Sequence, residues 1–242
     1  IPPKPKLSNG GGTAQVNKGD GTKIKGTLPK PKEECCKKPV PAMAKGSCDY
    51  YQKRYDNFIE RHKPCANRTP PEYYLNYGFK YCSKFKAETY QNLSPEGQEW
   101  LDKTLILLQQ FMDQGLVNLD YRSLNNEKFN TRVKQYKNGN FFQGIECRNA
   151  DHRYFAFATH PDAYRPDAMK MLPCSDLMKI AATPDWKEWL DGATWEQANI
   201  MREKMGVWET MNNCSKAEAG YRTDQLIEKT KDIINSIKSL FE

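Results

Sequence analysis

The feature that most constrains the fold of this chain is an abrupt change in composition after residue 47. Residues 1–47 contain seven of the fifteen Pro and seven of the fifteen Gly residues, but no Phe, Trp or Tyr. A segment of this kind has too little apolar surface to offset the entropy that is lost when a chain becomes ordered. We therefore expect a flexible, extended Pro/Gly/Lys-rich tail over 1–47 and a folded domain over 48–242.

The positive charge of the chain belongs to the tail. The net charge is +7, and residues 1–47 alone carry ten Lys against three acidic residues. The rest of the chain therefore has no net charge, whereas a nucleic-acid-binding domain usually carries a basic excess on its folded surface. We expect the tail to engage an acidic target, a protein partner or a delivery apparatus, and nucleic-acid binding is disfavoured for the domain.

The domain is predicted to be all-α, because apolar residues recur every three or four positions through most of it. The clearest helix follows Ser94, with Ser at the cap and Pro95 at the first helical position, and Gly115 closes it. Other helices are expected over 49–62, 70–85 and 126–137, in short segments between 154 and 208, and after 215 or 223. Residues 140–150 are the least helical and predict a small irregular or β element.

Two smaller features leave alternatives open. Gly78 lies inside the second helix, where it either weakens the helix mildly or marks the close approach of another backbone. His62 lies at the end of the first helix and is read as a solvated C-terminal cation. No apolar run reaches 18 residues, so no membrane-spanning helix is expected.

Eight cysteines are spread over the chain without the spacing of a zinc site. An even number in an exported protein suggests disulfides. The alternative is that Cys82 and Cys174 are buried core thiols. Neither a metal nor a cofactor is predicted, because the recognisable motifs for them are absent.

The candidate catalytic residues centre on His160, which precedes Pro161 and Asp162. If the domain is an enzyme, His160 is the predicted general base, and Asp162 or Asp151 orients it. The structural alternative is that His160 belongs to a helix start with Pro161 at its first position and Asp162 close to the positive end of the dipole. A cysteine nucleophile would draw on Cys82, Cys147 or Cys174, of which only Cys174 directly precedes a predicted helix.

The candidate binding surface is rich in tyrosine and lysine. Such patches can stack single-stranded nucleic acid or hold a carbohydrate or protein partner, although two helices packing through their tyrosines would give the same pattern. The predicted binding residues are Tyr74, Tyr77, Lys80, Tyr81 and Lys84.

Three stretches, over 77–85, 93–100 and 157–164, resemble helical cargo or effector domains of bacterial contractile injection (type VI-like) systems. The resemblance implies a secreted or injected effector or toxin whose tail serves for loading or docking. It implies no particular reaction. Two other functions stay open: a structural or adaptor protein that docks through its basic tail, and nucleic-acid binding through the Tyr/Lys-rich helices.

Overall fold

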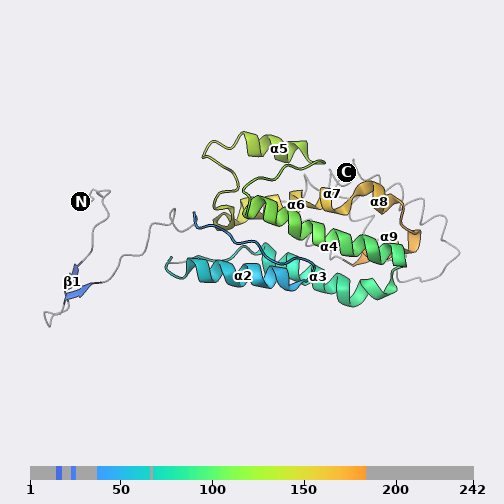
Figure 1. Ribbon diagram of the computed structural model, residues 1–242, viewed down its shortest axis with the longest axis horizontal. Coiled ribbons are helices and arrows are strands. Elements are labelled where there is room, and N and C mark those ends of the chain that lie inside the picture. The colour runs from blue at the N-terminus through green and yellow to red at the C-terminus, as the bar shows by residue number, and fades with distance from the viewer. Residues whose placement is uncertain (1–14, 18–22, 26–36, 66–67, 184–242) are drawn as a thin grey trace, which may run out of the picture.

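The computed structural model describes residues 15–17, 23–25, 37–65 and 68–183, and these form a helical domain preceded by two short strands (Figure 1). The all-α prediction for the domain is confirmed. The strands β1 (Gln15–Asn17) and β2 (Lys23–Lys25) pair antiparallel, with Val16 opposite Ile24. A pair of short antiparallel strands thus lies inside the predicted tail, and the predicted helices after residue 183 lie outside the described residues.

The two longest helices of the described domain are α2 (Asp49–His62) and α4 (Pro95–Leu116). The start of α4 is as predicted, because Ser94 accepts a hydrogen bond at its side chain from the backbone N–H of Gly97. Gly115 lies within the last turn of α4 and does not end it. A Cβ atom there would collide with the Phe155 ring, so this glycine permits close packing.

The second predicted helix has an unusual local form. Its backbone runs through a π-helix η1 (Tyr74–Phe79), α3 (Lys80–Lys84), a second π-helix η2 (Phe85–Thr89) and a short 3₁₀ turn η3 (Tyr90–Asn92). The Tyr51 ring packs directly on the backbone at Gly78, where any Cβ would overlap it. Gly78 thus permits a close approach, but the predicted approaching backbone is wrong, because the group that packs there is the Tyr51 side chain.

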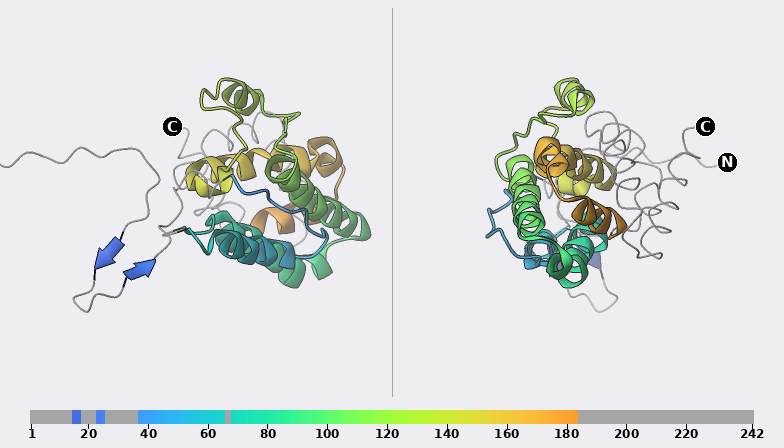
Figure 2. Two further views of the ribbon diagram at one scale, coloured as in Figure 1. Left: turned by 60° about the vertical axis from the view of Figure 1, so that its left-hand side comes forward. Right: turned by 90° about the vertical axis from the view of Figure 1, so that its right-hand side faces the viewer.

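The second half of the domain consists of short helices that cover one side of α4 (Figure 2). They are α5 (Glu127–Lys134), a 3₁₀ turn η4 (Ile145–Cys147), α6 (Asn149–Ala158), α7 (His160–Tyr164), α8 (Pro166–Lys170) and α9 (Cys174–Ala182). Residues 140–150 contain turns and η4 rather than a strand, so the irregular form of the prediction holds. Gly144 has a φ of 66°, which ends the turn before η4 in a left-handed conformation.

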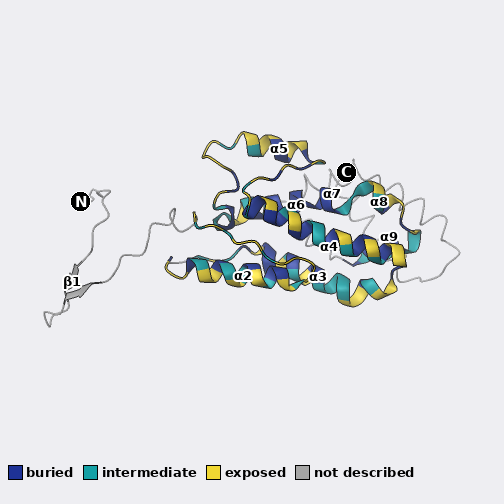
Figure 3. Cartoon of the chain, in the orientation of Figure 1, coloured by how far each residue is buried: buried dark blue, intermediate teal, exposed yellow. Residues whose placement is uncertain are grey.

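The core is rich in aromatic residues and joins α2, η1 and α4 to the short helices, as the buried residues in Figure 3 show. Phe129, from the face of α5 that points inward, packs its ring against Phe155 at 6.2 Å and Tyr154 at 5.7 Å between centroids. Aromatic pairs at such spacings add to the stability that burial provides. This core fixes α5 and α6 on α4.

The tail prediction needs one correction. Residues 37–47, called the strap below, extend along α2 and α4 and make specific contacts with both (Figure 1). The backbone N–H of Gly46 donates to Gln109 Oε1 at 2.7 Å, and Arg54 Nη1 donates to the carbonyl of Pro41 at 2.7 Å. The composition missed the strap because backbone groups and single polar side chains hold it, rather than aromatic residues.

The described cysteines are all disulfide-bonded. Cys48, just before α2, is bonded to Cys82 in α3, and their Cα atoms are 5.5 Å apart. Cys65, Cys147 and Cys174 are also disulfide-bonded. The interpretation of Cys82 and Cys174 as buried thiols is therefore wrong. Among the described residues, no helix is both long and apolar enough to cross a membrane.

Candidate functional site

His160 is buried and does not face the carboxylates predicted to orient it. Its Nδ1 lies 2.9 Å from the carbonyl of Ala156, and burial lowers its pKa to about 4. Asp162 is instead an anchor for the loop before α5: it accepts from the Tyr121 hydroxyl, from the backbone N–H of Leu124 at 3.0 Å and from that of Asn125 at 2.9 Å. The predicted base and its orienter are therefore not assembled.

Asp151, the other residue predicted to orient His160, forms ion pairs with two arginines instead. It pairs with Arg132 Nη2 at 2.9 Å and with Arg148 Nε at 2.8 Å. These ion pairs join α5 to the start of α6. Asp151 therefore holds two helices together and does not reach His160.

The predicted Tyr/Lys binding surface is divided by burial. Tyr74 is fully buried and donates its hydroxyl to Glu146 Oε1 at 2.6 Å, and Tyr81 is also buried. Tyr77 and Lys84 are half-buried, and Lys80 is exposed. A buried ring has no free face for a base, so the interpretation as two helices packing through their tyrosines fits better than a stacking platform.

The first buried ion pair joins α2 to α4. Arg54 has no exposed surface and donates through Nη2 to Asp113 Oδ1. Tyr50 also donates to Asp113, and Lys45 of the strap lies 2.6 Å from the second oxygen. Burial raises the pKa of the Asp113 carboxyl, but the surrounding donors outweigh it and lower the pKa overall. The strap is thus held by charges inside the domain.

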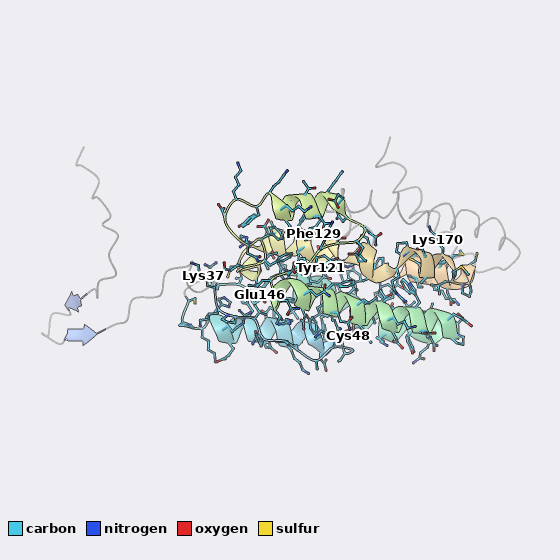
Figure 4. All side chains as sticks on the ribbon, turned by 45° about the horizontal axis from the view of Figure 1, so that its top comes forward. Lys37, Cys48, Tyr121, Phe129, Glu146 and Lys170 are labelled. Carbon is cyan, nitrogen blue, oxygen red and sulfur yellow. A yellow bond between two sulfur atoms is a disulfide. The ribbon has the colours of Figure 1, made fainter. Side chains whose placement is uncertain are left out.

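The second buried polar group joins α2 to η4. Glu146 is 4% exposed, accepts from Tyr74, and pairs with Arg61 Nη2 at 2.5 Å. Lys38 of the strap donates to the backbone carbonyl of Arg61. Strap, α2 and η4 therefore meet at one end of the domain, where Figure 4 labels Lys37 and Glu146.

A cavity of about 140 Å³ lies at this meeting point. Its walls include cationic residues from the strap and α2, apolar residues from the end of α4, and the turn around η4. The residues with side-chain chemistry that line it are Lys37, Lys38, Arg61, His62, Glu146 and Cys147. This cavity is the candidate functional site, because it brings a histidine and a cysteine sulfur together with buried and charged groups from three separate segments.

His62 in this cavity is buried rather than solvated, which corrects the sequence prediction. It is 4% exposed, and its ring stacks on Phe58 with 4.0 Å between centroids. Burial lowers the pKa of His62, and its backbone hydrogen bond with Phe58 acts in the opposite direction. The imidazole is therefore largely neutral near pH 7.

A larger, shallower groove of about 560 Å³ runs along α5 and the turn that follows. Its lining residues include Lys128, Arg132, Tyr136 and Lys137, whose aliphatic and aromatic parts supply most of the exposed lining. It is an open groove on a helix surface rather than an enclosed site. Among the described residues, no group of three or more His, Cys, Asp or Glu side chains could hold a metal ion.

Sequence reasoning missed the cavity for a definite reason. Its residues come from the strap, the end of α2 and η4, which are far apart in sequence and share no motif. The only local signal is the spacing of Phe58 and His62, which places the imidazole on the same face of α2 as a core residue.

Comparison of the chain with protein-family models, with curated proteins and with solved structures found no match.

Proposed function

We propose that the protein is an exported bacterial effector, with a disulfide-stabilised helical domain that acts on or binds a target and a basic N-terminal segment that serves for loading or docking. The observation that carries this proposal is the state of the cysteines: all five that the structure describes are disulfide-bonded. Disulfides persist in oxidising compartments and are rare where glutathione and thioredoxin keep thiols reduced.

The strap connects the basic segment to the folded domain. Basic residues before residue 37 continue into a segment that Arg54 and Gln109 hold against the domain. A delivery apparatus that binds the basic segment would therefore be attached to the folded domain through the hydrogen bonds of the strap. The resemblance of three stretches to cargo domains of injection systems supports the same role.

The adaptor function uses the same tail and differs in what the domain does. An adaptor needs only a rigid helical spacer, whereas an effector needs a site, and the cavity between the strap, α2 and η4 favours the effector. Nucleic-acid binding is the weakest candidate, because the burial of Tyr74 and Tyr81 removes two of the rings that would stack on bases.

The first experiment determines the redox state. Protein collected from the producing cells is treated with iodoacetamide without reductant, and the labelled peptides are identified by mass spectrometry. We expect no labelling of Cys48, Cys65, Cys82, Cys147 or Cys174. Quantitative labelling of all five would show a protein that stays in a reducing compartment, and the proposal would be wrong.

The second experiment separates effector from adaptor. A shortened chain over 35–242 removes most of the basic segment but keeps Cys35, Cys36 and the strap. We expect it to inhibit growth as strongly as the full chain when either is expressed directly in target cells, while its delivery from producing cells is lost. An adaptor would instead affect growth in neither form, and its shortened chain would fail to assemble with its partner.

A further inference from the structure

The cavity holds a contact between a histidine and a disulfide sulfur. Cys147 Sγ lies 3.7 Å from His62 Nε2, and the two residues come from η4 and from the last turn of α2. Both line the cavity of about 140 Å³. A sulfur that faces an imidazole nitrogen inside a cavity is the arrangement in which a cysteine can act as a nucleophile.

The orientation of the imidazole is fixed by its other nitrogen. His62 Nδ1 lies 2.7 Å from the carbonyl oxygen of Phe58. A carbonyl oxygen only accepts, so we assign the proton to Nδ1, and the neutral ring then presents the Nε2 lone pair to the Cys147 sulfur. Stacking on Phe58 holds the ring in this orientation.

The charges around the pair favour an anion at the sulfur. Arg61 and Lys38 act on His62 as positive charges, and Glu146 acts as a negative one. The negative charge of Glu146 is matched by its ion pair with Arg61, so Lys38 and the nearby Lys37 leave the cavity with a positive balance. Cys147 also lies two residues before the ten-residue helix α6, and positive surroundings at a helix start lower the pKa of a thiol.

We propose that Cys147 and His62 form a latent thiolate–imidazolium pair that is released when a thiol reductant opens the Cys147 disulfide. Two thiol molecules reduce the disulfide to two protein thiols and leave as one oxidised disulfide molecule. The proton of the Cys147 thiol then moves to His62 Nε2, which leaves a thiolate beside an imidazolium.

The released thiolate suits acyl substrates. It attacks the carbonyl carbon and forms a carbon–sulfur bond, while the bond to the leaving alcohol or amine breaks and that group takes the proton from His62. Water then hydrolyses the acyl–sulfur bond, which restores the thiol and yields a carboxylic acid. That the switch operates between an oxidising exterior and a reducing target cell rests on the proposed function; the chemistry of the pair does not.

The test frees Cys147 without reducing the remaining disulfides. Its partner cysteine is identified by peptide mapping of the unreduced full-length protein and replaced with Ser. Alkylation of Cys147 by iodoacetamide is then followed by mass spectrometry from pH 4 to 10. An ordinary cysteine has a pKa of about 8.5. We expect the alkylation of Cys147 to have a pH midpoint below about 7. At pH 6 its alkylation rate should be at least tenfold above that of Cys174, the first residue of α9, freed from its disulfide in the same way.

Variants then assign the effect to the histidine. In the same background, His62→Gln keeps a donor for Phe58 but removes the base, and we expect the midpoint to return towards 8.5. With p-nitrophenyl acetate as the probe, we expect a burst of p-nitrophenolate from the freed protein that His62→Gln slows at least tenfold and Cys147→Ser abolishes.

Two results would overturn the proposal. One is an alkylation midpoint near 8.5 for freed Cys147 in a protein whose circular dichroism spectrum is unchanged. This result can be interpreted without a His62 variant. The other is a low midpoint that both His62→Gln and His62→Asn leave in place. Either result leaves the export proposal intact, since that depends on the redox state of the protein from producing cells.

Discussion

Replacing His152 should stabilise the domain, although this residue lies at the centre of its aromatic core. His152 on α6 has no exposed surface, and neither ring nitrogen has a hydrogen-bond partner among the described residues. The ring touches Tyr74 and Tyr73 edge to face, with centroids 4.9 and 6.1 Å away. His152→Leu or His152→Phe keeps an apolar group in this position and removes two unsatisfied polar atoms.

The expected magnitude follows from two effects. A buried polar group without a partner costs about 1–3 kcal/mol, so His152→Leu should raise the free energy of unfolding at pH 7.5 by about that amount. Phe is larger than His, and overpacking would offset part of the gain for His152→Phe.

The second effect is the pH dependence of stability that follows from the lowered pKa of His152. Burial lowers the pKa of His152 from its usual 6.5 to about 3 in the folded state. The unfolded chain therefore takes up the proton first, and the stability present above pH 6.5 is lost as the pH falls from 6.5 towards 3. At pH 4.5, about two pH units below 6.5, this residue alone should lower the free energy of unfolding of the wild type by about 3 kcal/mol, since each pH unit contributes about 1.36 kcal/mol.

Urea unfolding without reductant measures both effects. We expect the difference between His152→Leu and wild type to widen from pH 7.5 to pH 4.5, while the shared contribution of His160 cancels. The reasoning would be refuted if both variants were less stable than wild type by more than about 1 kcal/mol at pH 7.5. That result would mean that the imidazole has a partner, such as a buried water molecule.

Three further predictions concern the framework of the domain. Arg54→Leu should lower the free energy of unfolding by about 3–5 kcal/mol, because Asp113 is left buried without its main partner. Urea unfolding should show that the double variant Arg54→Leu/Asp113→Leu loses less stability than the two single variants added together. Gly78→Ala should destabilise by about 1–3 kcal/mol because its Cβ overlaps the Tyr51 ring, and thermal unfolding measures this loss. Replacing Cys48 and Cys82 with Ser should cost about 2–4 kcal/mol, because the bond closes a loop with a sequence separation of 34; equal stability of the double variant and wild type would contradict this.

The helices were largely predictable because their signals are local. Ser94 and Pro95 mark the start of α4 in the sequence, and the structure confirms both the cap and the helix. Asn126 similarly caps α5 through a hydrogen bond from the backbone N–H of Phe129 at 2.9 Å. A cap needs only residues within one turn, so it is visible without knowledge of the tertiary fold.

The π-helical segments could not be predicted in the same way. In η1 the Tyr51 ring packs on the backbone at Gly78, a contact between residues of two helices. The sequence indicated only that Gly78 was unusual. Tertiary contacts of this kind override the local preference for an ordinary α-helix.

The candidate site was missed because polar residues of α2 were expected to face water. Arg54 and His62 lie on the buried side of that helix, where Asp113, Glu146 and the strap surround them. Apolar periodicity counts such residues as solvent-facing, although each is compensated by a partner that is distant in sequence.

The location of the cavity follows from this same compensation. The strap and η4 have the least regular backbone of the domain, and each is held to α2 through a polar contact: Lys38 to the carbonyl of Arg61, and Glu146 to the Arg61 guanidinium. Polar contacts require particular distances and leave space that apolar packing would fill. The cavity of about 140 Å³ therefore lies where these two polar-anchored segments meet, and His62 and Cys147 both lie at its wall. Replacing Arg61 with Leu would leave Glu146 buried without its ion-pair partner and alter the wall of the cavity, so it should change the reactivity of a freed Cys147.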